Sequence, residues 1–71
     1  MNMDFQLRGE YIELDKLLKA TGLAQSGGRA RVMITEGLVQ VDGQLESRKT
    51  AKIRSGQVVT IGNERIEVRA A

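Results

Sequence analysis

The chain has 71 residues and a net charge of +2; 41% of the residues are hydrophobic, 28% are charged, and none is cysteine or histidine. This length and composition predict one folded domain, residues 1–71, rather than a disordered chain. Without cysteine and histidine there is no disulfide, no thiolate or imidazole metal ligand and no imidazole general base, so we expect neither catalysis nor a cofactor.

A strand and a short helix are predicted in the first third of the chain. Residues 4–8 alternate polar and apolar side chains, as a half-buried strand does, and Gly9 interrupts the alternation. A short helix follows, and Gly22 stands where its C-terminal cap belongs. Its apolar side chains recur at the i, i+3 and i+4 positions of one face: Leu14, Leu17 and Leu18. Within this helix, Asp15 and Lys19 are spaced to form an i,i+4 ion pair.

A second helix is predicted from Ser26, whose side chain can cap the N-terminus, to Gly37, which ends it. Its apolar side chains repeat the same spacing: Ala30, Met33 and Ile34. Only residues 23–25 join the two helices, so we expect them to form a compact corner.

Beyond the second helix the hydrophobic period becomes that of a strand. Residues 39–41 and 44–46 flank an Asp-Gly pair, residues 42–43, which is a strong signal for a two-residue hairpin turn. Residues 58–61 and 65–68 carry β-branched side chains and predict two further strands. The predicted fold class is α+β, with two short helices packed on a small, mainly antiparallel β-sheet. The expected core is Leu14, Leu17, Leu18, Ala30, Met33, Ile34, Val39, Val41, Leu45, Ile53, Val58, Ile61, Ile66 and Val68.

Five short patterns occur in a fixed order between residues 14 and 61. They are Leu14-Asp15-Lys16 in the first helix, Ala30-Arg31 in the second, Gly37 at its end, a Val-x-Val-Asx-Gly hairpin at residues 39–43, and a basic-apolar-basic-x-Gly run at residues 52–56. In this order they resemble the RNA-binding domain named after ribosomal small-subunit protein S-four, also called the αL motif. The Ser-Gly-Gly-x-Ala-Arg start of the second helix and the Glu-x-Arg-Lys run at residues 46–49 are most similar to small free-standing bacterial members, the YbcJ-type and YaaA-type proteins.

The resemblance implies an αL-motif core at about residues 14–61 and a protein that grips structured RNA, ribosomal or tRNA-like, in a role around the ribosome or translation. The catalytic domain that accompanies this motif in much of the family is not expected here. One departure concerns the start of the second helix, where many members have arginine or another polar residue directly after the capping serine. This chain has Gly27 and Gly28 there, so a side-chain contact cannot be carried over to that position.

The start of the second helix is the first candidate RNA contact, comprising Ser26, Gly27 and Gly28. A helix N-terminus offers unpaired backbone N–H groups and a partial positive charge, and glycines let an RNA phosphate approach them closely. The alternative is that the two glycines are only a poor start to the helix, since each glycine destabilises a helix by about 1 kcal/mol relative to alanine.

Two arginines of the second helix are further candidates. Arg29 and Arg31 lie about 160° apart around the helix axis, so both cannot face one RNA surface equally. Arg31 matches the basic position of the family and is the preferred contact, with Arg29 as a helper near the helix start. The alternative for Arg31 is an ordinary solvated helix face.

Four cations lie within seven residues after the hairpin: Arg48, Lys49, Lys52 and Arg54. Residues 29–54 carry six Arg and Lys against three Asp and Glu, whereas residues 1–28 carry three against four. A one-sided basic surface is an electrostatic footprint of nucleic-acid binding. We expect this cluster to share a concave surface with the second helix, bordered by Lys16 and Lys19 of the first helix, where Asp15 and Glu13 weaken the positive field. The alternative is that these charged side chains only protect a sheet edge from pairing with other chains.

Recognition is expected to use phosphates and RNA shape rather than base stacking, because Phe5 and Tyr11 are the only aromatic residues. The predicted protein is a cytoplasmic monomer without a membrane partner or a small-molecule substrate, since it has no run of about 20 apolar residues and no secretory signal.

Three other function classes stay open. The first is a small protein–protein adaptor whose basic face meets an acidic partner. DNA binding is disfavoured, because neither helix presents a row of Asn, Gln or Arg suited to reading bases. An enzyme that uses only carboxylates, or a Mg²⁺ site, would require a water-excluding cleft that so small a core hardly provides.

Overall fold

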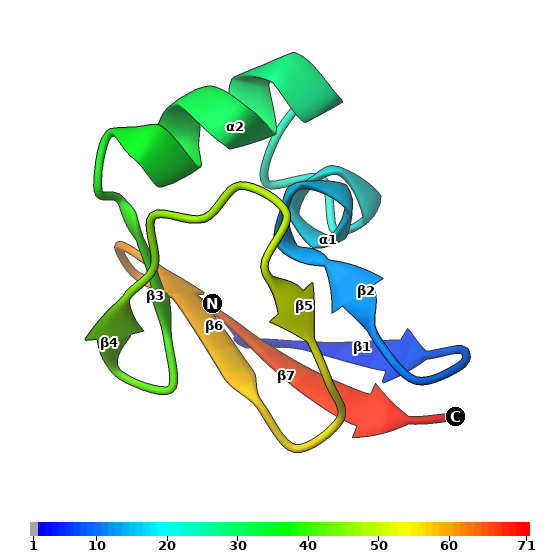
Figure 1. Ribbon diagram of the computed structural model, residues 1–71. Helices are drawn as coiled ribbons and strands as arrows, with labels where there is room; N and C mark the ends of the chain where they lie inside the picture. Colours follow the sequence, from blue (N-terminus) through cyan, green and yellow to red (C-terminus); the bar gives the residue numbers. More distant parts are fainter. Residues whose placement is uncertain (1) are drawn as a thin grey trace.

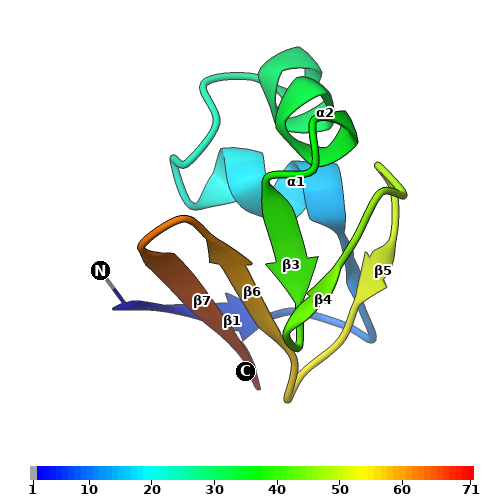
Figure 2. The same ribbon diagram turned by 90° about the vertical axis from the view of Figure 1, so that its left-hand side faces the viewer.

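Two helices cover one face of a five-stranded sheet, and a two-stranded ribbon stands beside them (Figure 1). The structure, a computed structural model, describes residues 2–71. Its elements in chain order are β1 (Asn2–Leu7), β2 (Ile12–Glu13), α1 (Leu14–Ala20), α2 (Gly27–Thr35), β3 (Val39–Val41), β4 (Gln44–Leu45), β5 (Lys52–Ile53), β6 (Val58–Ile61) and β7 (Glu64–Ala70). The predicted α+β class is confirmed. Seen from the side, both helices lie above the sheet (Figure 2).

The large sheet has the strand order β1-β7-β6-β3-β4. Its pairs are antiparallel except for β1 and β7, which run parallel, so the sheet is mainly antiparallel, as predicted. β1 begins earlier than predicted, because the whole stretch from Asn2 to Leu7 pairs with residues 65–70. It ends before Gly9, whose φ of +88° breaks the extended backbone.

The small ribbon pairs β2 with β5 in antiparallel register, with Ile12 opposite Ile53 and Glu13 opposite Lys52. The sequence predicted neither strand, because two residues are too few to display an alternating pattern. The pairing nevertheless matters for the site, since it fixes residues 11–13 beside residues 52–54.

Local sequence signals set the start of α2 and the ends of both helices. The hydroxyl oxygen of Ser26 accepts a hydrogen bond from the backbone N–H of Arg29 at 3.1 Å, so the predicted cap of α2 is confirmed. Gly22 and Gly37 follow the two helices with φ angles of +81° and +78°. The predicted ion pair within α1 is wrong, because the carboxylate of Asp15 turns toward α2 instead.

The predicted β3–β4 hairpin is confirmed, with Val41 opposite Gln44. Asp42 and Gly43 take φ angles of +52° and +81°, as a two-residue primed turn requires. The Asp42 carboxylate also accepts a hydrogen bond from the backbone N–H of Val58 at 2.9 Å, which joins the turn to β6.

The core lies between the helices and the sheet. Its buried hydrophobic residues are Leu7, Leu14, Leu17, Leu18, Ala24, Ala30, Met33, Ile34, Val39, Ala51, Ile53, Val59, Ile66 and Val68. Leu45 was predicted to be buried but is 63% exposed, because β4 is the outer strand of the sheet. Val58 was also misplaced: side chains alternate along β6, so its neighbour Val59 points into the core. Val41 and Ile61 are half-buried against this core.

Candidate nucleic-acid interface

Asp15 is the buried carboxylate at which α1, α2 and residues 46–51 meet. Its side chain is only 5% exposed, and its Oδ2 atom accepts a hydrogen bond from Nε of Arg31 on α2 at 3.2 Å. Its Oδ1 atom accepts from the backbone N–H of Lys16 at 2.9 Å. Its own backbone N–H donates to the carbonyl of Lys49 at 3.1 Å. The start of α1 therefore holds both Arg31 and the backbone that carries the predicted cationic cluster.

The 46–51 segment connects β4 to β5 and passes below α2 and in front of α1 (Figure 1). The Leu14 N–H donates to the carbonyl of Ala51 at 2.9 Å, and the Glu46 N–H donates to the carbonyl of Val39 at 3.0 Å. Both ends of the segment are thus pinned by backbone hydrogen bonds. A shallow depression on it is lined by Arg48, Thr50, Ala51 and Lys52, without a residue of α2. The concave surface that we expect this cluster to share with the second helix stays a prediction.

Arg48 is held by a carboxylate that the sequence analysis had not paired with it. Its Nε and Nη2 atoms donate to the two carboxylate oxygens of Glu46 at 3.0 and 3.1 Å, and its backbone N–H donates to Oε2 at 3.0 Å. These hydrogen bonds lower the pKa of Glu46 below its usual value and raise that of Arg48. The charge of Arg48 is consequently balanced at short range, unlike that of its neighbour Lys49.

The β2–β5 ribbon places a second group of charged residues on its outer face. Ile53 is buried and Ile12 packs against the core, so the alternation of side chains turns Glu13, Lys52 and Arg54 outward. Within residues 2–71, neither Lys52 nor Arg54 pairs with a carboxylate; both lie over the ring of Tyr11 instead. Their distances to the ring centre are 5.0 Å from Lys52 Nζ and 5.8 Å from Arg54 Cζ.

Lys16 borders this outer face from α1. Its Nζ atom lies 3.0 Å from Oε1 of Glu13, and this hydrogen bond raises the pKa of the Lys16 ammonium group. Lys16 and Glu13 neutralise each other, so the net charge of the outer face comes from Lys52 and Arg54.

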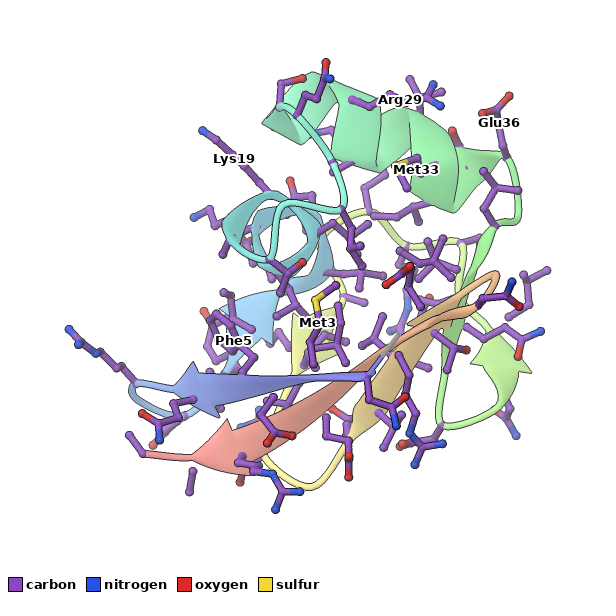
Figure 3. All side chains as sticks on the ribbon, turned by 180° about the vertical axis from the view of Figure 1, so that it is seen from behind. Met3, Phe5, Lys19, Arg29, Met33 and Glu36 are labelled. Atoms are coloured by element: carbon purple, nitrogen blue, oxygen red, sulfur yellow. The ribbon has the colours of Figure 1, made fainter. Side chains whose placement is uncertain are left out.

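The N-terminal turn of α2 is open to solvent at Gly28. A Cβ atom placed on Gly28 would lie 3.8 Å from Oγ of Ser26, and one placed on Gly27 would lie 3.7 Å from Nη2 of Arg31. Both are ordinary van der Waals distances, so packing in the folded protein does not require glycine at either position. Arg29 extends outward from α2 (Figure 3), whereas Arg31 reaches across to Asp15.

Hydrogen bonds and strand pairing connect the elements that carry most of the predicted contacts. We call the following six residues the basic side: Lys16, Arg31, Arg48, Lys49, Lys52 and Arg54. Ser26, Gly27, Gly28 and Arg29 lie at the start of α2, where Gly27 is close to the guanidinium group of Arg31. The part played by Tyr11 here is not evident from the sequence, because it depends on the pairing of β2 with β5.

Metal binding and membrane insertion each depend on a recognisable arrangement of residues. No three side chains of Asp and Glu within residues 2–71 lie close enough together to hold a metal ion. Neither described helix is long and apolar enough to cross a membrane.

Residues 5–69 match the S4 domain family. The chain is 43% identical over 60 residues to the Escherichia coli (strain K12) protein named "Putative RNA-binding protein YbcJ", and the match covers 84% of this chain and 86% of that protein. "Uncharacterized protein YbcJ" of Shigella flexneri matches with the same identity and coverage. A solution structure of YbcJ from E. coli, described as revealing an αL motif involved in RNA-binding, resembles this fold with a TM-score of 0.67 and 38% identity. That likeness covers 97% of this chain and 86% of the other.

Proposed function

The chain belongs to the S4 domain family, and on this premise we propose that it is a non-catalytic protein that grips structured RNA with its basic side. The relatives support RNA as the ligand, since one is named an RNA-binding protein and its structure is described as having an RNA-binding motif. We propose further that residues 1–71 act as one domain, a monomer in the cytoplasm, and that the RNA is ribosomal or tRNA-like, in a role around the ribosome or translation.

The observation that carries this proposal is the set of cations without a carboxylate partner on the basic side. Within residues 2–71, Lys49, Lys52 and Arg54 form no ion pair. Arg31 is 54% exposed, and it uses Nε for Asp15, which leaves its two terminal nitrogen atoms available for a phosphate. A guanidinium group oriented in this way suits the bidentate recognition of phosphate oxygens.

Phosphate contacts of this kind fix the position of an RNA without reading its bases. Duplex RNA is recognised mainly by its shape, through phosphates and 2′-hydroxyl groups, because its deep major groove excludes side chains. The basic side of this protein offers charge rather than a row of amide side chains, so we propose recognition of RNA shape.

Binding to a structured RNA over a series of salt concentrations tests this function. About four phosphate contacts should give a log–log salt dependence with a slope of roughly −3 to −4. Treatment of cell fractions with RNase should release the protein from its partner. Retention after RNase treatment, with no measurable affinity for RNA, would favour the adaptor function instead.

A charge-reversal pair locates the site. Lys49→Glu plus Lys52→Glu should reduce RNA affinity about 100-fold, because it removes two phosphate partners and adds repulsion. The matched control is Arg65→Glu plus Arg69→Glu, which changes the net charge equally at two exposed residues of β7. Equal losses from both pairs would mean that only overall charge matters and that the basic side is not the site.

A further inference from the structure

We propose that Tyr11, with Lys52 and Arg54, forms a stacking site for one unpaired nucleotide next to the structured part of the RNA. This inference rests on the proposed RNA binding and extends it to a residue outside the αL-motif core. The ring of Tyr11 would stack on the base, and the two cations would hold the phosphates that flank it.

The position of Tyr11 follows from the register of the ribbon. Ile12 pairs with Ile53 in antiparallel orientation, so the next pair outward sets Tyr11 opposite Arg54. Because Ile53 is buried and Ile12 packs against the core, the alternation turns Tyr11 to the same outer face as Lys52 and Arg54. Tyr11 is 41% exposed, so part of its side chain is accessible to a ligand.

The surroundings of the Tyr11 ring are suited to the base and to the phosphates of a nucleotide. On one side lies a depression with a largely apolar lining, formed by Phe5, Gln6, Leu7, Arg8, Tyr11 and Ile12. A flat base can cover this apolar surface and the neighbouring ring. Lys52 and Arg54 have no carboxylate partner within residues 2–71, so they can take the anionic phosphates. The carboxylate of Glu13 opposes this binding only weakly, because Lys16 neutralises it at 3.0 Å.

Fold stability alone does not explain why two cations lie over the ring of Tyr11. Cation–π contacts at exposed sites contribute little to stability. The same geometry is suited to nucleic acid, since a base that stacks on an aromatic ring gains from nearby arginine and lysine. The base must be unpaired, because bases within a duplex already stack on each other and present only their edges.

Fluorescence of the protein itself reports on this site, because Tyr11 is the only tyrosine and the chain has no tryptophan. We would titrate the wild-type chain with a blunt-ended RNA hairpin and with the same hairpin carrying a short unpaired tail at either end. A tail that reaches Tyr11 should quench its emission more strongly than the blunt hairpin does. It should also raise the affinity about tenfold, as expected for stacking of one base.

Two variants separate the ring from its hydroxyl group. Tyr11→Leu should lose the advantage of the tailed hairpin and keep the affinity for the blunt one, whereas Tyr11→Phe should keep both. If the wild-type chain binds blunt and tailed hairpins equally, with equal quenching, the stacking site is refuted and the proposed RNA binding stands. If it binds neither hairpin, the proposed function fails first. Should Tyr11→Leu not fold, the quenching of the wild-type chain decides alone.

Discussion

The carboxylate of Asp15 on α1 and the guanidinium group of Arg31 on α2 form, within residues 2–71, the one ion pair that involves a buried charged side chain, with Oδ2 and Nε 3.2 Å apart. Asp15 also accepts a hydrogen bond from the Lys16 N–H and, through its backbone, binds the 46–51 segment. Asp15 thus joins the two helices through its carboxylate and the segment that carries Lys49 through its backbone N–H.

Replacement of Asp15 by alanine should destabilise the fold by about 1–3 kcal/mol, because it leaves the Lys16 N–H and the Arg31 Nε without their acceptor. Urea unfolding measures this loss. Glu13→Ala is the matched control, since it removes a half-buried carboxylate whose partner Lys16 is exposed, at the same end of α1, and should cost less. Equal losses for both variants would contradict the special position of Asp15.

The features that could be predicted from the sequence are the ones that short local patterns carry. Ser26 caps α2 by accepting a hydrogen bond from the backbone N–H of Arg29, three residues later. The Asp-Gly pair at residues 42–43 specifies its own turn. The αL-motif resemblance depends on such patterns, and the S4 domain match confirms it. The fold class followed from the same signals.

The features that could not be predicted depend on contacts between distant residues. β2 and β5 are two residues long, and only their pairing brings Tyr11 to Arg54. The partner of Asp15 was expected on its own helix, but the corner between α1 and α2 brings Arg31 closer. In consequence the sequence identified the cations of the basic side without revealing which of them are already paired.

Glu46→Gln should strengthen RNA binding several-fold. The variant removes the carboxylate that holds Arg48 at 3.0 Å and so frees a cation beside Lys49. One additional phosphate contact should also steepen the log–log salt dependence by about one. Binding measured at several salt concentrations checks both expectations. An unchanged slope would indicate that Arg48 already contacts the RNA despite its pairing, or that it lies outside the interface.

The same pair predicts a pH dependence of stability. Hydrogen bonds from Arg48 hold the pKa of Glu46 below its usual value, so the folded state favours the charged carboxylate more than the unfolded chain does. The stabilisation is complete above the unfolded-state pKa, about 4.3, and is lost as the pH falls through the lower pKa of the folded state. The effect is small, because the Arg48 side chain is 78% exposed and solvent screens the pair.

Unfolding of the wild-type chain and of Glu46→Gln at neutral and at acidic pH tests this dependence. The difference in free energy of unfolding between the two should shrink as the pH is lowered below the usual range of glutamate. A difference that does not change with pH would mean that the pair contributes nothing to stability.

The turn at Asp42 should respond in a graded way to substitution. Asp42 has a φ of +52°, which asparagine tolerates better than alanine, and its carboxylate accepts the Val58 N–H at 2.9 Å. Asp42→Asn keeps an acceptor and the turn and should cost less than about 1 kcal/mol, whereas Asp42→Ala loses both and should cost about 1–3 kcal/mol. Thermal unfolding ranks the two variants, and a reversed order would contradict this account of the turn.

Substitution of Gly28 at the start of α2 should affect fold stability and RNA binding differently. Gly28 lies in the first turn of the helix, and apart from neighbouring helix backbone an added Cβ would approach no atom closer than 3.8 Å. Gly28→Ala should therefore stabilise the fold by about 0.5 kcal/mol, because alanine favours the helix more than glycine does.

If a phosphate approaches the backbone N–H groups here, the new methyl group should obstruct it and weaken RNA binding, and Gly28→Val should weaken it further. Affinity is measured per folded molecule, so that stability does not enter the comparison. Two variants that bind RNA as well as the wild-type chain would show that Gly28 is only a poor helix start and that the RNA does not reach the N-terminus of α2.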